Sequence, residues 1–121
     1  MSRVLKFRAK RRSFNQWVYF DLLSEINSNK EPSEFMQYHL DEKTVGEYSG
    51  LKDKNGVEIY EGDILELNNC SLLIVCFYKG EFKLQKLAEY HKKRNIYASI
   101  SYLEFGILRG NIYDNPELLT I

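Results

Sequence analysis

The sequence predicts an α+β protein that is mostly β, a small SH3-like barrel or sandwich with an N-terminal β-hairpin and one or two short helices. Short runs of β-branched and aromatic residues recur along the chain, and turn residues separate them at short intervals. With 121 residues, 44% of them hydrophobic and 28% charged, the composition fits one globular domain over residues 1–121.

The N-terminal segment predicts a hairpin. Val4–Ala9 alternates apolar residues on one side with bases on the other, which is typical of a half-buried strand. Phe14–Phe20 is rich in aromatic and β-branched residues, and the polar turn Lys10–Ser13 separates the two runs. Asp21 is then expected to cap a short helix that ends in the polar loop Asn27–Pro32.

The middle of the chain predicts further short strands, two before residue 48 and a meander of three after residue 64. Turns are expected at Asn68–Asn69 and Lys79–Gly80, where small and polar residues interrupt the apolar runs. The expected strands are Phe35–Leu40, Thr44–Tyr48, Ile64–Leu67, Leu72–Tyr78 and Glu81–Leu87.

The C-terminal third is less uniform. Residues 84–95 fit a helix period as well as a continuing strand, and both interpretations stay open. Ile100–Phe105 and Ile107–Tyr113 are expected to form a strand pair or one strand bent at Gly106. A closing helical turn is predicted next, because Asn115 can cap it, Pro116 suits its first position and Glu117 favours its dipole.

Residues 48–64 form the most distinctive segment. Asn55-Gly56 predicts a two-residue type I′ hairpin turn, which needs positive φ at both positions. Asp53 would then lie opposite Glu58, and opposed like charges are unfavourable. One interpretation is that Asp53 accepts hydrogen bonds from backbone amides around the turn. The alternative is a cation site built from the acids of the segment, Asp53, Glu58, Glu61 and Asp63.

Glu61-Gly62-Asp63 predicts a sharp reversal into a strand, with glycine permitting the turn and the aspartate accepting amide hydrogen bonds. The tyrosines of this region suit the core or a binding surface. The residues expected to shape turns and ends are Gly50, Asp53, Asn55, Gly56, Tyr60, Gly62, Asp63, Gly110, Asn115 and Pro116.

These motifs resemble the YopX-like proteins of bacteriophages and prophages of Gram-positive bacteria. The matching segments are Phe7-Arg8-Ala9, the whole of Tyr48–Ile64, and Gly110–Leu119. The resemblance implies a phage-encoded cytoplasmic protein with a β-rich fold and an uncharacterised molecular function, and it supplies no catalytic residues. The chain departs from the family after Ala9, where it has Lys10-Arg11-Arg12.

The charge distribution is uneven although the net charge is zero. Residues 1–20 hold six of the 17 bases and none of the 17 acids, which leaves 11 bases against 17 acids in the rest. This basic arm, residues 3–12, could bind nucleic acid or an acidic partner, or its charges could be solvated or paired with the acidic remainder. Its candidate binding residues are Arg3, Lys6, Arg8, Lys10, Arg11 and Arg12.

Side chains for catalysis or metal binding are not grouped in the sequence. Cys70 and Cys76 fall in one predicted strand, roughly 20 Å apart at about 3.3 Å per residue, so they cannot pair within it. His39 and His91 have no Cys-x-x-Cys nearby, and neither a Gly-x-Ser-x-Gly nor a phosphate-binding glycine loop occurs. We therefore expect no enzyme activity, no metal and no cofactor.

No apolar run reaches the roughly 20 residues needed to cross a bilayer, and bases interrupt the N-terminus where a secretory signal would need an apolar stretch. A cytoplasmic protein without membrane contact is expected. The leading functional hypothesis is a non-catalytic module that binds a host or phage protein, and that forms a homo-oligomer through strand edges or aromatic patches. The alternative is sequence-nonspecific nucleic-acid binding through the basic arm.

Overall fold

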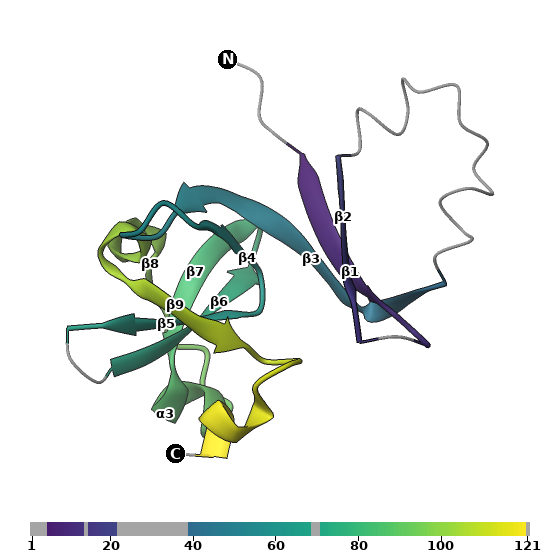
Figure 1. Ribbon diagram of the computed structural model, residues 1–121. Helices are drawn as coiled ribbons and strands as arrows, with labels where there is room; N and C mark the ends of the chain where they lie inside the picture. Colours follow the sequence, from purple (N-terminus) through teal and green to yellow (C-terminus); the bar gives the residue numbers. More distant parts are fainter. Residues whose placement is uncertain (1–4, 14, 22–38, 69–70, 121) are drawn as a thin grey trace. The chain divides into compact units, whose positions relative to one another are not determined.

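The computed structural model describes residues 5–13, 15–21, 39–68 and 71–120 (Figure 1). The chain divides into two compact units, Met1–Tyr48 and Ser49–Ile121, and strand β3 (Leu40–Lys52) runs through the boundary. The described residues are mainly antiparallel strands with a few short helices, which confirms the α+β, mostly β class.

The first unit contains the predicted hairpin. β1 (Lys6–Arg11) pairs antiparallel with β2 (Trp17–Asp21), with Phe7 opposite Phe20. The rings of this pair stack with their centroids 5.7 Å apart. Arg11 N donates to the Gln16 carbonyl at 3.0 Å and closes the turn. The helix expected after Asp21 lies outside the described residues, as does most of the strand expected at Phe35–Leu40.

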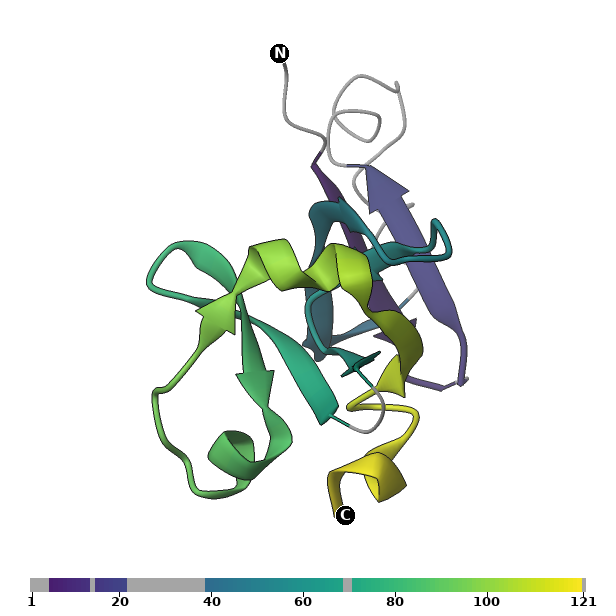
Figure 2. The same ribbon diagram turned by 90° about the vertical axis from the view of Figure 1, so that its left-hand side faces the viewer.

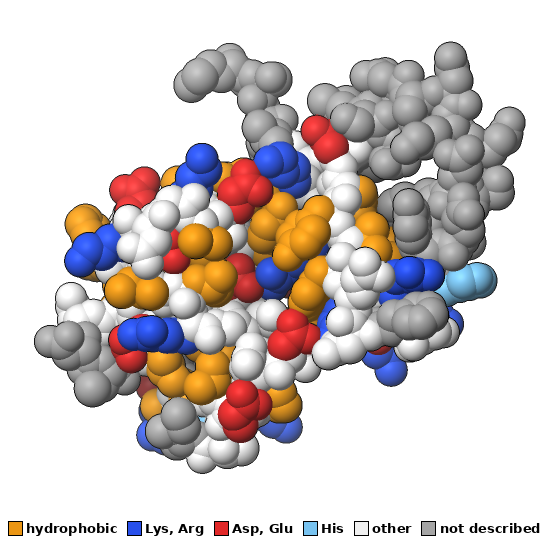
Figure 3. Space-filling view, in the orientation of Figure 1, with side chains coloured by type: hydrophobic (Ala, Val, Ile, Leu, Met, Phe, Trp, Pro, Cys, Tyr) orange, Lys and Arg blue, Asp and Glu red, His pale blue; other side chains and the backbone are white. Residues whose placement is uncertain are grey.

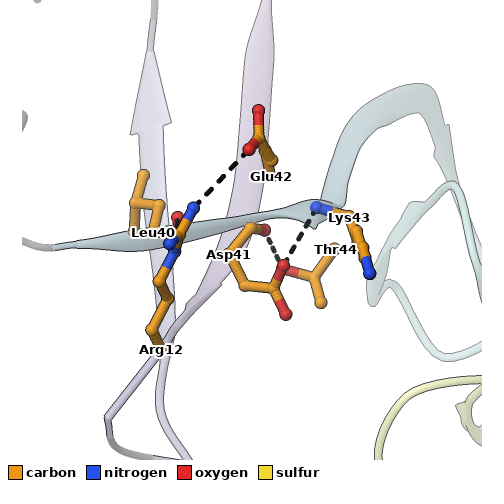
Figure 4. Close-up of polar contacts among 6 residues, drawn as sticks. All are labelled: Arg12, Leu40, Asp41, Glu42, Lys43 and Thr44. Atoms are coloured by element: carbon orange, nitrogen blue, oxygen red, sulfur yellow. Dashed lines mark hydrogen bonds and ion pairs between the residues drawn. The ribbon is translucent and has the colours of Figure 1, made fainter.

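The β1–β3 pairing contains a bulge. Arg8 lies opposite Gly46 but Lys10 lies opposite Asp41, so residues 42–45 of β3 bulge out of the ladder. The Thr44 hydroxyl replaces the backbone hydrogen bonds that the ladder loses at the bulge. It accepts from Lys10 N at 2.8 Å and donates to the Asp41 carbonyl at 2.7 Å. Asp41 Oδ1 accepts from Lys43 N at 3.1 Å (Figure 4). The strand predicted at Thr44–Tyr48 is thus part of β3.

The second unit is built on a five-stranded antiparallel sheet with the order β8-β7-β6-β5-β9. The predicted meander is confirmed in β5, β6 and β7, which pair in register as neighbours. The strands are β5 (Asp63–Leu67), β6 (Ser71–Tyr78), β7 (Glu81–Lys86), β8 (Ala98–Ser99) and β9 (Ile107–Asn111). β4 (Glu58–Tyr60) belongs to the other sheet, whose order is β2-β1-β3-β4. Both sheets are open, which agrees with the sandwich alternative of the predicted class.

Both faces of the five-stranded sheet are covered, because alternate side chains point to opposite sides. The larger cluster joins the sheet to β4 and to the 3₁₀ helix η1 (Ile100–Phe105) and consists of Ile59, Leu65, Leu73, Val75, Leu84 and Leu103. The smaller cluster lies on the other face, where α3 (Leu87–His91) and the 3₁₀ helix η2 (Pro116–Thr120) pack, and consists of Ile64, Ile74 and Leu87 with Leu72, Ile112, Leu118 and Leu119.

Residues 84–95 contain both of the elements that the sequence left open, first the end of a strand and then a short helix. The strand β7 ends at Lys86 and the helix α3 begins at the next residue. The predicted closing helical turn after Asn115 is confirmed as η2.

The prediction of a strand at Ile100–Phe105 is wrong, since this segment is the 3₁₀ helix η1. Ile100 and Leu103 both pack on the larger cluster, and a spacing of three residues is the period of a 3₁₀ helix and not of a strand. The Ser99 side chain accepts from Ser101 N and starts the helix. No helix in the described part of the chain is long and apolar enough to span a membrane.

Leu65 provides a test of the core. Its side chain is fully buried in the larger cluster, so Leu65→Ala should lower the free energy of unfolding by about 2–5 kcal/mol. Urea titration measures this change. Val57→Ala is the matched control, because Val57 is exposed and its truncation should cost less than about 1 kcal/mol. Similar costs for the two variants would contradict the core assignment.

Candidate functional site

The turn at residues 53–57, here called the signature turn, differs from the predicted type I′ hairpin. Gly56 has φ of +82°, but the non-glycine residues with positive φ in the described chain are His39, Asn68, Lys79 and Lys93, and Asn55 is not among them. Gly56 N donates to the Asp53 carbonyl and Asp53 N donates to the Val57 carbonyl. The loop therefore has three residues and ends in a left-handed glycine.

This longer loop removes the conflict between opposed acids. Asp53 lies opposite Val57, one position away from Glu58, so the two carboxylates do not face each other across the hairpin. The predicted type I′ geometry occurs instead at Lys79–Gly80, with φ of +51° and +80° between the paired residues Tyr78 and Glu81.

The prediction that Asp53 accepts hydrogen bonds from backbone amides around the turn is confirmed. Its buried carboxylate accepts from Asn55 N and Val57 N through Oδ1, each at 2.9 Å. Its Oδ2 accepts from Leu108 N of β9, also at 2.9 Å. Lys54 N donates to the Gly106 carbonyl at the end of η1. The signature turn is therefore fastened to the junction between η1 and β9.

Gly62 and Asp63 also act as predicted. Gly62 has φ of +93°, and a Cβ there would lie 3.1 Å from the Tyr113 ring. Its N–H donates to the Val75 carbonyl and its carbonyl accepts from Ile112 N. The fully buried Asp63 accepts from Tyr60 N at 2.8 Å. These contacts join the reversal to β6 and to the C-terminal segment.

The C-terminal motif is held by two asparagines. Asn115 Oδ1 accepts from Asn111 N, and a Cβ at Gly110 would overlap this Asn115 side chain. Asn111 Oδ1 accepts from Tyr113 N and Asp114 N. Pro116 begins η2 as predicted. Gly50 has φ of +84° and open space at its Cβ position, so its backbone conformation alone favours glycine.

The acids of residues 53–63 do not form a cation site. Among the described residues, no three histidines, cysteines or acids come together in a group that could hold a metal. Both oxygens of Asp53 already accept backbone hydrogen bonds. The Asp53 carboxylate therefore serves to hold the turn in place.

Exposed rings lie beside the signature turn. Phe105 is 69% exposed and Tyr102 is 53% exposed, although both belong to η1, whose Leu103 is completely buried. Residues three apart on a 3₁₀ helix lie on the same side, so these two rings share one side, here called the η1 aromatic face. Hydrophobic side chains reach the surface of the protein among charged ones (Figure 3).

The basic arm is only partly on the surface. Arg8 is 5% exposed, with its guanidinium 4.4 Å from the centre of the Trp17 ring, and Lys10 lies 5.7 Å from the same ring. Lys6 lies over Tyr48 at 5.5 Å. Arg8 and Lys10 therefore project to one side as predicted, but Trp17 covers them.

The tip of the arm contacts its own unit. Arg12 Nε donates to the Leu40 carbonyl at 3.1 Å, and its guanidinium lies 3.5 Å from Glu42 (Figure 4). Arg11 donates to the Gln16 side chain. Arg3 lies outside the described residues. Pairing with an acid is thus observed for Arg12, and nucleic-acid binding by the arm stays a prediction.

Sequence reasoning missed a second basic surface, formed by the run His91, Lys92, Lys93 and Arg94 after α3. All four residues are exposed. The acidic balance of residues 21–121 concealed it, and counting charge in short windows would have revealed the run His91–Arg94.

Cys76 is a half-buried free thiol, and its Sγ donates to the Lys83 carbonyl at 3.4 Å. Burial, with a further contribution from the Glu61 charge, raises the pKa of Cys76 from 9.0 to about 11. A thiol with this pKa is a poor nucleophile at neutral pH. Cys70 lies outside the described residues.

Comparison with known proteins gives one family and one fold. The model of the family described as YopX protein matches residues 6–120. The crystal structure of protein EF1440 from Enterococcus faecalis aligns over 98% of this chain and 99% of its own, with 24% sequence identity and a TM-score of 0.58. At that identity the likeness shows the fold alone. No curated protein sequence matches this chain.

Removing the Asp53 carboxylate should destabilise the second unit. Asp53→Ala leaves three backbone N–H groups without their acceptor and should cost about 2–4 kcal/mol in urea unfolding, whereas Asp53→Asn, which keeps one oxygen, should cost less. The control is Glu104→Ala, an exposed acid on η1. Equal, small effects of Asp53→Ala and the control would contradict the role given to Asp53.

The thiol of Cys76 should react slowly in the folded protein. Its pKa is about 11 when folded against 9.0 for an ordinary thiol, so the folded state holds roughly 100-fold less thiolate below pH 9. Alkylation of Cys76, followed by peptide mass spectrometry, should slow accordingly relative to the protein in urea. The unfolded thiol loses its proton first, so its contribution to stability should decline between pH 9 and 11. Equal alkylation rates would refute the burial of this group.

Proposed function

The chain belongs to the YopX protein family, and we propose that it is a non-catalytic protein-binding module that forms a homo-oligomer. The observation that carries the proposal is the η1 aromatic face, where two large rings stay exposed on a short helix that is otherwise anchored in the core. The proposal includes a phage or prophage origin and a place in the bacterial cytoplasm, both taken from the family resemblance.

The anchoring of η1 supports a binding role for its exposed rings. Leu103 fixes the inner side of the helix in the core, and Lys54 N holds its end through the Gly106 carbonyl. The rings of Tyr102 and Phe105 are therefore presented on a backbone with little freedom to move. Binding through such a surface loses little conformational entropy, and burying a Phe side chain contributes roughly 1.5–3 kcal/mol.

Tyrosine and phenylalanine are also the residue types that interfaces favour. They provide a large contact area with few rotatable bonds, and a tyrosine adds a hydroxyl group that can form a hydrogen bond at the rim. A symmetric dimer would place the same face of two copies together, so each ring would be used twice. A host or phage protein could use the same surface.

Substitution of the two rings tests the proposal. The double variant Tyr102→Ser/Phe105→Ser should lower the mass measured by size-exclusion chromatography with light scattering, because it removes the apolar contact area. Its thermal stability should stay close to that of the parent, since both side chains are mainly exposed.

Ile96→Ser is the matched control, because Ile96 is 55% exposed in the same unit but lies after α3 and not on η1. It should leave the mass unchanged. A parent protein that stays strictly monomeric at its highest soluble concentration would contradict the oligomer. A double variant that keeps the mass of the parent oligomer would show that the η1 aromatic face is not the interface.

A further inference from the structure

The basic surface around α3 consists of His91, Lys92, Lys93 and Arg94. It lies at the end of α3 and in the loop that joins α3 to β8 (Figure 2, lower left). The protein as a whole has no net charge, so an attraction for anions has to come from a local concentration of bases. This surface is such a concentration of bases, and it is built from other residues than the basic arm and the η1 aromatic face.

The backbone of the loop is held in one conformation. Lys93 has φ of +55°, and its N–H donates to the Tyr90 carbonyl. Arg94 N donates to the Glu89 carbonyl at 3.0 Å. The buried Gln85 donates through Nε2 to the Arg94 carbonyl at 2.7 Å. The chain therefore returns to the end of β7, where the Gln85 side chain holds the Arg94 backbone.

No acid neutralises this surface within the described residues. Ion pairs in the described part of the chain include those of Arg12, Lys83 and Arg109, whereas Lys92, Lys93 and Arg94 take part in none. The acid of α3 is Glu89, and its Oε2 is buried. Among residues 5–13, 15–21, 39–68 and 71–120, these positive charges consequently have no carboxylate as a counter-ion.

Aromatic rings lie at both ends of the loop. Tyr90 is 38% exposed and meets the His91 ring edge-on at 5.8 Å. At the other end Tyr97 stacks on Tyr78 at 4.6 Å, and Lys79 lies over the Tyr78 ring at 5.5 Å. Bases close in sequence to an exposed ring, here Tyr90, are the combination found in grooves for single-stranded nucleic acid.

We propose that this surface binds single-stranded nucleic acid, with Lys92, Lys93 and Arg94 contacting phosphates and Tyr90 stacking on a base. Phosphates match the unpaired cations, and release of their counter-ions supplies the binding free energy. An acidic peptide offers carboxylates but no ring for Tyr90. A duplex offers phosphates but keeps its base faces covered. The single strand is the partner that uses both parts of the surface.

Fluorescence anisotropy of the full chain with labelled oligo-dT of about 20 nucleotides, longer than a usual site, tests the proposal. Lys92→Gln/Lys93→Gln should weaken binding roughly tenfold at low salt and reduce the salt slope by about 1.4, because each phosphate contact on a single strand contributes about 0.7. Tyr90→Ala should weaken binding by a smaller factor without changing the slope. Circular dichroism confirms that the variants are folded.

Two controls locate the site. Lys52→Gln/Lys54→Gln removes the same charge from exposed residues of the same unit, and Arg11→Gln/Arg12→Gln removes it from the basic arm. Both should change the affinity less than twofold. Equal losses in all three double variants, or a loss confined to the arm variant, would overturn the proposal, as would absence of binding to oligo-dT at low salt. Equally tight binding of duplex DNA or of polyglutamate would reject the single strand as the partner.

Discussion

The carboxylate of Asp53 joins two segments of the second unit, the signature turn and strand β9. Its three hydrogen bonds join the signature turn to the start of β9, more than fifty residues later in the sequence. The next residue donates to the end of η1, so one short loop sets the positions of a strand and a helix. A buried carboxylate can do this because it has two acceptor oxygens, and three backbone N–H groups supply the partners that a buried charge needs.

The proposed surfaces follow from this construction. Since the signature turn fixes the end of η1, the inner side of that helix fills the core and its other side carries two rings to the surface. The basic surface has an equivalent anchor in Gln85, whose side chain reaches across to the loop after α3. The Asp53 carboxylate and the Gln85 amide are both buried, and both form hydrogen bonds with backbone atoms. Each thereby fixes a backbone segment whose neighbouring side chains are exposed.

Much of the strand pattern could be predicted. The alternation in residues 4–9 and the apolar runs of the meander have strand periodicity, and turn residues separate them, so local chemistry was sufficient. Two predictions failed where local chemistry allows several answers. Asn55-Gly56 suits a two-residue type I′ loop or a three-residue loop with a left-handed glycine, and the bonds to Asp53 select the second. Ile100–Phe105 has the composition of a strand, but the core accepts Ile100 and Leu103 at a spacing of three.

The sequence by itself determined that this is a mainly β protein with an N-terminal hairpin, with turns at its glycines and a basic N-terminus, and that it resembles the YopX family. These properties depend on residues that are close together in the chain. The tertiary structure decided that Asp53 binds Leu108, that Lys54 binds Gly106, and that Gly62 lies against Tyr113. Each of these depends on which distant residues approach, and that depends on the packing of the whole unit, which no local pattern encodes.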